Sequence, residues 1–393
     1  MSVGLFIDIF VVLIIVAAVV SGFARGFLRT LGTVAGIVAG GAAALIVMPI
    51  ISAQVPFAGW NVTAAILAGL ALVAIGIAIG EAIAHAIRKP VHRVGLGFVD
   101  RFLGGVAGLV ASTAVLLILA MSAGSFGVPG IAQAVASSKV LSFLEETTPP
   151  PVQSALAQLR SITIDDGLPV VLDAAGIADA DAEVPDADAN TTALQTAAAS
   201  VTRITTNAPT CSAASSGSGF VIGEGLVMTN AHVVAGAQDV VVEASGEFPR
   251  SATVVYFDPD ADIAVLSVSG LTAAPLPFSA SPAVGETVFF QGFPYGGPFT
   301  SRSAKVLSTA QLSTPDIYQA ALVSRSVTSI AGVVQPGNSG GPLLTADGAL
   351  AGMIFARSES PPNVGFALSM EELAPVLAAA PGLTAAVPTG ACA

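Results

Sequence analysis

The stretch GSGFVIGEGLVMTNAHVV, residues 217–234, contains two short apolar runs separated by a glycine-rich turn, and it carries a histidine just after the second run. Short runs rich in β-branched residues and bounded by Gly, Asn or Asp are typical of β-strands. The stretch therefore predicts two strands followed by His232.

The same pattern continues around this stretch, from about residue 195 onward. The β-branched runs are SVTRITT, GSGFVIG, LVMTN, DVVVEA, ATVVYF, IAVLSV, ETVFFQGF, AKVLST, ALAGMIF and VGFALS. Many short strands with turn signals and few helical patterns favour a sandwich or a pair of barrels. We expect an all-β double β-barrel domain over residues 195–393.

The first third of the chain differs, because it holds four apolar stretches that can each cross ~30 Å of hydrocarbon as a helix. They cover residues 4–23, 31–51, 62–87 and 102–126. Recurrent Gly and Ala along the last three permit close helix packing. A cleaved signal peptide does not explain the first stretch, since no basic segment precedes it and three more stretches follow. We expect an all-α membrane domain of four spanning helices over residues 1–126.

Basic residues in short loops predict how these helices are oriented, because Lys and Arg resist translocation. The basic residues of these loops are Arg25 and Arg29 after the first stretch, and Arg88, Lys89, Arg93 and Arg101 after the third. The loop after the second stretch has none. Both basic loops are expected in the cytoplasm, which puts the N-terminus and everything after residue 126 on the periplasmic side of the inner membrane.

The net charge of −12 is unevenly divided. Residues 1–125 hold six basic and three acidic residues, so the remainder holds eight basic and 23 acidic ones. Such an acidic part is a poor candidate for binding nucleic acid or anionic lipid. Asp8 and Glu81 lie near span ends, where a side chain that reaches the interface is favoured over a proton path.

Residues 127–194 are expected to form a linker. IAQAVASSKVLSFLEE and VQSALAQLRSI are predicted amphipathic helices, separated by the breaker TTPPP. The acidic, Ala-rich residues 173–190 lack the glycine and terminal glutamate spacing of an EF-hand loop. We therefore expect a solvated segment there and no metal site.

Two residue types in the β domain point to acid–base chemistry. His232 is the only histidine after residue 126. Asp258, Asp260 and Asp262 follow, and Asp262 directly precedes an apolar strand, where a carboxylate can be buried against the Nδ1 hydrogen of an imidazole. We expect Asp258 and Asp260 in the preceding turn.

The stretch QPGNSGGPLL, residues 335–344, supplies a nucleophile. Glycines around Ser339 permit a sharp turn and a close backbone approach, and the amides of Gly337 and Ser339 can stabilise a developing oxyanion. The chain order His232, Asp262, Ser339 is one of the known orders of this constellation. The predicted chemistry is serine-centred acyl transfer with no metal or organic cofactor.

GSGFVIGEGLVMTNAHVV, DIAVLSV, GNSGGPLL and GFALS resemble the chymotrypsin-fold proteases of the bacterial HtrA (Deg) group, over roughly residues 195–375. The resemblance implies a serine endopeptidase with His232 as general base, Asp262 as its orienting partner and Ser339 as nucleophile. It also implies an oxyanion hole at Gly337, Asn338 and Ser339.

The same fold family places the residue six before the nucleophile at the floor of the substrate pocket. That residue is Val333. An apolar floor argues against Arg or Lys before the cleaved bond and favours medium apolar side chains.

SGFARGFLRTLG (21–32) and VDRFLGGVAGLV (99–110) resemble the membrane segments of the colicin V production protein family. The combination resembles an actinobacterial family of membrane-anchored periplasmic serine proteases linked to acid resistance in mycobacteria. It implies a role in acid and oxidative envelope stress. An imidazole with an ordinary pKa near 6.5 is mostly protonated near pH 5. An acid-stress role therefore requires a milder local pH, a site that keeps its histidine neutral, or an indirect link.

The two cysteines, Cys211 and Cys392, are too far apart for a CxxC motif. They form either a disulfide in an oxidising compartment or two free thiols, and the predicted topology favours the disulfide. The bond would pin the C-terminal tail across the domain, with stabilisation favoured over a redox switch.

The function predicted from the sequence is a membrane-anchored serine endopeptidase that acts on proteins of the cell envelope. One alternative is a catalytically silent sensor or scaffold that uses the protease fold to bind peptides. Another is a channel or transporter formed by the four spans, with the β domain as a gate.

Overall fold

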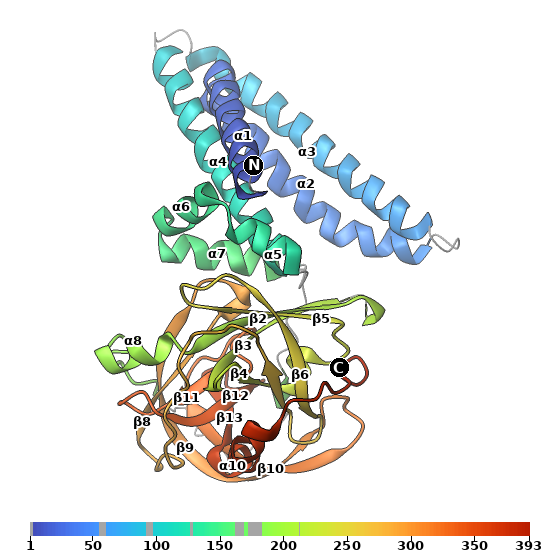
Figure 1. The fold of residues 1–393 in the computed structure, drawn as a ribbon. Helices are drawn as coiled ribbons and strands as arrows, with labels where there is room; N and C mark the ends of the chain where they lie inside the picture. The colour runs from blue at the N-terminus through green and yellow to red at the C-terminus, as the bar shows by residue number, and fades with distance from the viewer. Residues whose placement is uncertain are drawn as a thin grey trace. The chain divides into compact units, whose positions relative to one another are not determined.

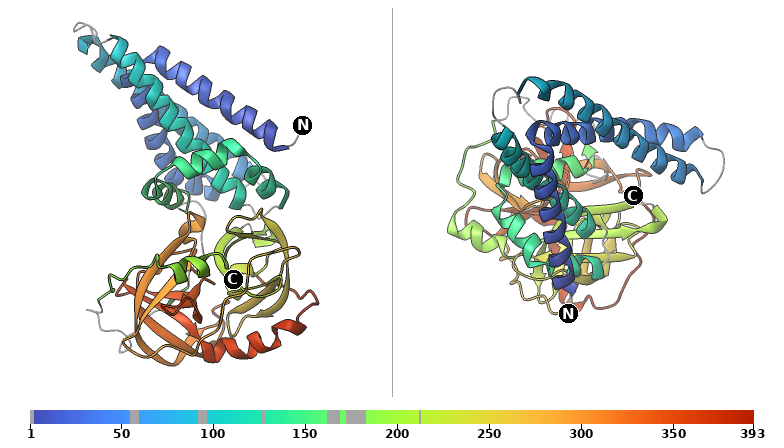
Figure 2. Two further views of the ribbon diagram at one scale, coloured as in Figure 1. Left: turned by 60° about the vertical axis from the view of Figure 1, so that its left-hand side comes forward. Right: turned by 90° about the horizontal axis from the view of Figure 1, so that it is seen from above.

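The computed structural model describes residues 3–54, 60–91, 97–125, 129–161, 169–171, 183–211 and 213–393. The chain divides into two compact units, one over Leu5–Leu117 and the other mainly over Ile118–Ala393. The first unit consists of helices, whereas two β-barrels make up most of the second (Figures 1 and 2). The domain boundaries expected at residues 126 and 194 remain predictions.

The first unit contains the apolar helices. They are α1 (Val3–Arg25), α2 (Phe27–Gln54), α3 (Trp60–Val91) and α4 (Gly97–Ser125). Each is long and apolar enough to cross a membrane, and within the described residues these four alone meet that condition. The chain is therefore a multi-pass membrane protein, and the prediction of a four-helix membrane domain is confirmed.

Glycines set how closely these helices pack. A Cβ on Gly36 of α2 would overlap the carbonyl of Gly76 on α3, and a Cβ on Gly22 of α1 would overlap the carbonyl of Gly104 on α4. Such contacts bring two backbones together, which gives helices in lipid the van der Waals packing that the hydrophobic effect does not supply there.

The Glu81 carboxylate on α3 is paired inside the helical unit. Arg25 and Arg29 each place a guanidinium nitrogen 3.7 Å from it. The Thr33 hydroxyl also donates a hydrogen bond to it at 3.1 Å. These contacts tie α3 to the junction between α1 and α2.

Three helices of the second unit follow α4. They are α5 (Pro129–Ala136), α6 (Lys139–Thr147) and α7 (Pro150–Ser161). The first predicted linker helix is thus two helices, because the Ser138 hydroxyl accepts from the Leu141 amide and caps a new helix start. Of the acidic segment, residues 173–182 lie outside the described residues, and 183–190 form no helix or strand.

The first barrel follows the short helix α8 (Thr192–Ala198). It closes in the order β2-β3-β4-β7-β6-β5. Its strands are β2 (Val201–Ala208), β3 (Ala213–Gly223), β4 (Leu226–Thr229), β5 (Asp239–Ala244), β6 (Arg250–Asp258) and β7 (Ile263–Ser267). A 3-10 turn, η2 (Pro209–Cys211), follows β2, and the short helix α9 (Ala231–Val234) follows β4.

The second barrel runs in the order β12-β11-β8-β9-β10-β13 and closes because β13 also pairs with β12. Its strands are β8 (Thr287–Gly292), β9 (Thr300–Pro315), β10 (Leu322–Ala331), β11 (Pro342–Leu344), β12 (Leu350–Ser358) and β13 (Val364–Ser369). Helix α10 (Met370–Ala379) and the turn η4 (Ala380–Gly382) follow β13, and η3 (Pro294–Gly296) follows β8. Residues 170–171 form β1, which pairs in parallel with β12.

One apolar cluster joins the two barrels. It contains Phe220 and Met228 from the first barrel with Phe355 and Phe366 from the second, all almost fully buried. Figure 2 shows the barrels side by side. The all-β double-barrel prediction is confirmed, and any site between the barrels has a rigid apolar base beneath it.

Candidate active site

His232 lies on α9, where its ring faces Asp262. Its Nδ1 lies 2.8 Å from Oδ2 and 3.0 Å from Oδ1 of the carboxylate. The His232 amide donates to Oδ1 at 3.0 Å, so the carboxylate fixes both the backbone and the ring of the histidine. Asp262 is buried, which strengthens the interaction because little water screens it.

The other two acids of this loop have different contacts. The Asp258 carboxylate accepts from the amides of Asp260 and Ala261 and therefore holds the turn. Asp262 has a φ of +57°, a left-handed conformation that a non-glycine residue adopts only when neighbours hold it. One neighbour is Asn230, whose side-chain amide donates to the Asp262 carbonyl at 2.9 Å.

Ser339 lies in the turn between β10 and β11, and contacts from the first barrel shape this turn. The Ser218 amide on β3 donates to the Ser339 carbonyl at 2.8 Å, and the Ser218 hydroxyl donates to the Gly337 carbonyl at 2.7 Å. Gly337 has a φ of +88° and Gly340 a φ of +79°, so both need the freedom of glycine. We call the turn that carries Ser339, the predicted nucleophile, the nucleophile turn. It is thus held between the two barrels.

The three residues of the predicted oxyanion hole differ in their hydrogen bonds. The backbone amide of Asn338 donates to the backbone carbonyl of Gln335 at 3.0 Å, so it is already used inside the turn. Among the residues that the structure describes, the amides of Gly337 and Ser339 donate no hydrogen bond. These two amides are the donors that a substrate oxygen can use.

Ser339 and His232, the predicted nucleophile and base, are not hydrogen-bonded to each other. The hydroxyl oxygen of Ser339 and Nε2 of His232 are both buried, and neither has a hydrogen-bond partner within the described part of the chain. Proton transfer between these two atoms would first require a rotation of the Ser339 side chain or a small shift of the turn. In the described residues no group of three metal-binding side chains lies together.

A loop beside the nucleophile turn was not identified from the sequence. The Tyr295 amide donates to the Pro336 carbonyl at 2.6 Å, and the Phe293 amide donates to the Ser218 hydroxyl at 2.9 Å. Arg203 on β2 lies 5.8 Å from the centre of the Phe293 ring and forms an ion pair with Glu243 at 2.6 Å. The Glu243 charge raises the pKa of Arg203. The loop over 293–297 therefore supports the turn that carries the two free amides.

Val333 is partly exposed, at 39% of its surface, and lines a pocket of about 230 Å3. The other lining residues are Val184, Ala187, Ala189, Ser301, Arg302 and Ser303. The pocket thus combines the strand edge of β9 with part of the acidic segment, and Ser303 donates a hydrogen bond to the Pro185 carbonyl. Its role in substrate selection remains a prediction.

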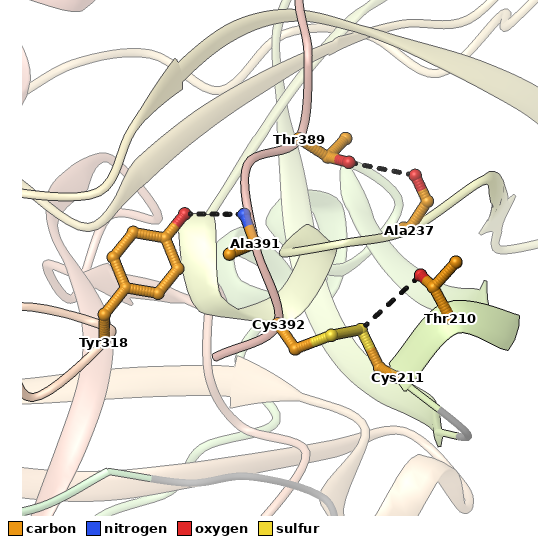
Figure 3. Close-up of a disulfide and its surroundings, with 7 residues drawn as sticks. All are labelled: Thr210, Cys211, Ala237, Tyr318, Thr389, Ala391 and Cys392. Carbon is orange, nitrogen blue, oxygen red and sulfur yellow. Dashed lines mark hydrogen bonds between the residues drawn. A yellow bond between two sulfur atoms is a disulfide. The ribbon is translucent and has the colours of Figure 1, made fainter.

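Cys211 and Cys392 form a disulfide, so the disulfide prediction is confirmed (Figure 3). The tail around it is also held by hydrogen bonds. The Gly236 amide donates to the Thr389 carbonyl at 3.0 Å, and the Ala391 amide donates to the Tyr318 hydroxyl at 3.3 Å. The tail therefore contacts the segment that follows α9 and the hairpin between β9 and β10.

Two family matches cover most of the chain. Residues 217–353 match the trypsin-like peptidase domain, and residues 7–149 match the colicin V production protein family. The second match includes all of α6. Together with the fold, these matches define the chain as a trypsin-like serine endopeptidase joined to a multi-span membrane domain.

Similarity to individual proteins identifies the family. The chain is 36% identical over 317 residues to serine protease Rv3671c of Mycobacterium tuberculosis (strain H37Rv), and the alignment covers 78% of each chain. The protein belongs to the family of this serine protease. It is also 35% identical over 164 residues to a probable periplasmic serine endoprotease DegP-like of Pseudomonas fulva, which covers 40% of this chain and 33% of the other.

A solved structure agrees with this assignment. The crystal structure of the active form of the Rv3671c protease from M. tuberculosis is 39% identical, with a TM-score of 0.52. It covers 57% of this chain and 94% of the other.

Proposed function

We propose that this membrane serine protease cleaves proteins of the cell envelope through an acyl-enzyme, with His232, Asp262 and Ser339 as a catalytic triad. The supporting observation is the Asp262 carboxylate on Nδ1 of His232 at 2.8 Å. This contact leaves Nε2 without a partner in the described residues and directs it to act as a base.

In the first half of the reaction, the Ser339 hydroxyl oxygen attacks the carbonyl carbon of the scissile peptide, and Nε2 of His232 takes the hydroxyl proton. The carbonyl oxygen becomes an oxyanion that accepts from the amides of Gly337 and Ser339. Loss of one such donor typically costs about 2.7–4 kcal/mol of transition-state stabilisation. Asp262 remains ionised and stabilises the imidazolium.

In the second half, the imidazolium of His232 gives its proton to the leaving amine, which departs and leaves an ester on Ser339. A water then attacks this ester while Nε2 takes its proton, and the return of that proton to the Ser339 oxygen releases the acid product. Apart from this water, the steps use only these side chains and amides.

We place the protease domain on the periplasmic side of the inner membrane. Support comes from the basic residues between α1 and α2 and between α3 and α4, because such loops remain in the cytoplasm. An alkaline phosphatase reporter fused after residue 161 is expected to be active, and one fused between α3 and α4 inactive. The reverse pattern would refute this orientation and the envelope substrates with it.

A role in envelope stress resistance is proposed on two grounds: the similarity to membrane-anchored proteases linked to acid resistance, and a disulfide that requires an oxidising compartment. A strain that lacks the protein is expected to lose viability in acid or peroxide. Wild-type protein should restore it, and Ser339→Ala protein should not. Equal rescue by both would separate the stress role from proteolysis.

The test of the triad is labelling of the full chain with a fluorophosphonate, which reacts with activated serines. Labelling is expected in wild type and lost in Ser339→Ala. Ser329→Ala is the matched control, because the Ser329 hydroxyl on β10 is also buried without a partner in the described residues.

Labelling is compared between oxidised and reduced samples, each at pH 5 and at pH 7. Loss of labelling only in Ser339→Ala supports the triad. Absence of labelling from wild type under every condition would favour the peptide-binding scaffold instead.

A further inference from the structure

A buried cation lies at the interface between the two barrels. Arg325, on β10 of the second barrel, is only 3% exposed. Among the described residues, no carboxylate lies within ion-pair distance of its guanidinium, and Nη2 has no hydrogen-bond partner. A charge in this position is costly, because it has left water without gaining a counter-ion.

Arg325 has contacts in both barrels, and one of them reaches a loop of the first barrel. Nε donates to the Asp260 carbonyl at 2.7 Å. Nη1 donates to the Thr314 hydroxyl on β9 at 2.9 Å, and the guanidinium lies 5.9 Å from the centre of the Phe355 ring. Thr314 and Phe355 belong to the same barrel as Arg325, and the bond to Asp260 is the one that reaches the first barrel.

Asp260 lies two residues before Asp262. Within the described part of the chain, the remaining side-chain hydrogen bonds of residues 258–262 come from the first barrel, from Tyr256, Asn230 and His232 and from within the loop. Asp262 needs such support because its left-handed backbone is unfavourable for a residue with a Cβ. A charged donor makes a stronger bond to a carbonyl than a neutral one.

We infer that Arg325 is a positioning residue for the proposed triad. It holds the loop of Asp262 from the opposite barrel, and so sets the direction in which Asp262 presents His232 to the nucleophile turn. This inference rests on the proposed function, because it assumes that Asp262 and His232 act in catalysis. If Arg325 served only the stability of the fold, the prediction would differ. An apolar side chain in place of an unpaired buried charge often preserves or raises stability, so its replacement would then not lower activity.

The test measures the rate of fluorophosphonate labelling at saturation (kinact) and the half-saturating concentration (KI) for the full chain in detergent. Arg325→Met is expected to lower kinact by on the order of 10–100-fold, because a displacement of about 1 Å at a reacting group has an effect of that size. KI should stay within about twofold, since no residue that contacts the probe changes. Arg325→Lys keeps the charge on a single donor nitrogen but not the planar fork, so its kinact should lie between those of Arg325→Met and wild type.

The matched control is Thr314→Val, which removes the acceptor of Nη1 and leaves the bond to Asp260 in place. Its kinact should stay close to wild type. A loss in Thr314→Val as large as that in Arg325→Met would overturn the inference, because general loosening around Arg325 would then explain both. A change in KI instead of kinact would overturn it too.

A double-mutant cycle separates this inference from the proposed function. If Arg325 acts through Asp262, Arg325→Met has no further effect on kinact in an Asp262→Asn background. Equal losses in both backgrounds would overturn the inference while the triad stands. An Asp262→Asn variant with wild-type kinact would instead overturn the triad. If Arg325→Met does not fold, Arg325→Lys decides alone, and a kinact equal to wild type then counts against Arg325.

Discussion

The disulfide between Cys211 and Cys392 is expected to supply a large part of the stability of the β domain. It closes a loop of 181 residues. In the chain-entropy model, a crosslink over a loop of this length stabilises the folded state by roughly 5 kcal/mol, because it restricts the unfolded chain. The double variant Cys211→Ala, Cys392→Ala should lose about this free energy of unfolding.

Pulse proteolysis of the full chain in urea measures this loss, with the surviving β domain as readout. With an m-value of about 1–3 kcal/mol/M, the midpoint should fall by at least about 1.5 M. Wild type with reductant should match the double variant, and reductant should leave the double variant unchanged. Thr389→Val is the control for tail contacts, since it removes only the side-chain bond to the Ala237 carbonyl and should cost about 1 kcal/mol (Figure 3). A difference below about 1 kcal/mol between oxidised and reduced wild type would refute the chain-entropy reasoning.

Three further predictions concern other parts of the molecule. Burial raises the pKa of Tyr256 to about 12, so the neutral phenol stabilises the fold below pH 10 and this contribution is lost as the pH rises toward 12; Tyr256→Phe should show a smaller loss of stability in urea unfolding between pH 9 and pH 12. Gly36→Leu should disrupt the packing of α2 on α3, because its Cβ would overlap the Gly76 carbonyl; tryptic cleavage of detergent-solubilised helices should rise, whereas fluorophosphonate labelling stays unchanged. Replacement of residues 169–171 by Gly-Ser-Gly should free the edge of β12 that β1 occupies, and should lower KM for an extended peptide substrate, since such peptides bind by adding a strand to a free edge.

The barrel strands differ in how easily the sequence reveals them. The run IAVLSV predicts β7 because nearly every residue is apolar and buried. β10, with the sequence LVSRSVTSIA, was missed, although its residues from Arg325 onward are buried. Ser326, Thr328 and Ser329 are buried although their side chains are polar, and the buried Arg325 breaks the apolar pattern on which strand prediction depends. The polar residues that hid the strand include the one proposed to position Asp262.

In the candidate site, too, the sequence reveals some features and not others. The position directly before an apolar strand singles out Asp262 over Asp258 and Asp260, and the structure brings Asp262 against His232. Ser218 lies far from Ser339 in sequence, and nothing in its own neighbourhood indicates that it holds the nucleophile turn. The absent bond between Ser339 and His232 depends on side-chain rotation, which sequence patterns do not encode.

The site is assembled across an interface, and this governs how its activity can change. His232 and Asp262 belong to the first barrel and Ser339 to the second, so in the proposed reaction the relative position of the barrels sets the distance over which the proton moves. Hydrogen bonds cross this interface from both sides: Ser218 holds the nucleophile turn from the first barrel, and Arg325 holds the Asp262 loop from the second. The barrels also share one apolar cluster, which resists sliding because its packing is dense. A change in either hydrogen bond can therefore move the reacting groups apart while each barrel stays folded, so activity is expected to be more sensitive than stability to these contacts.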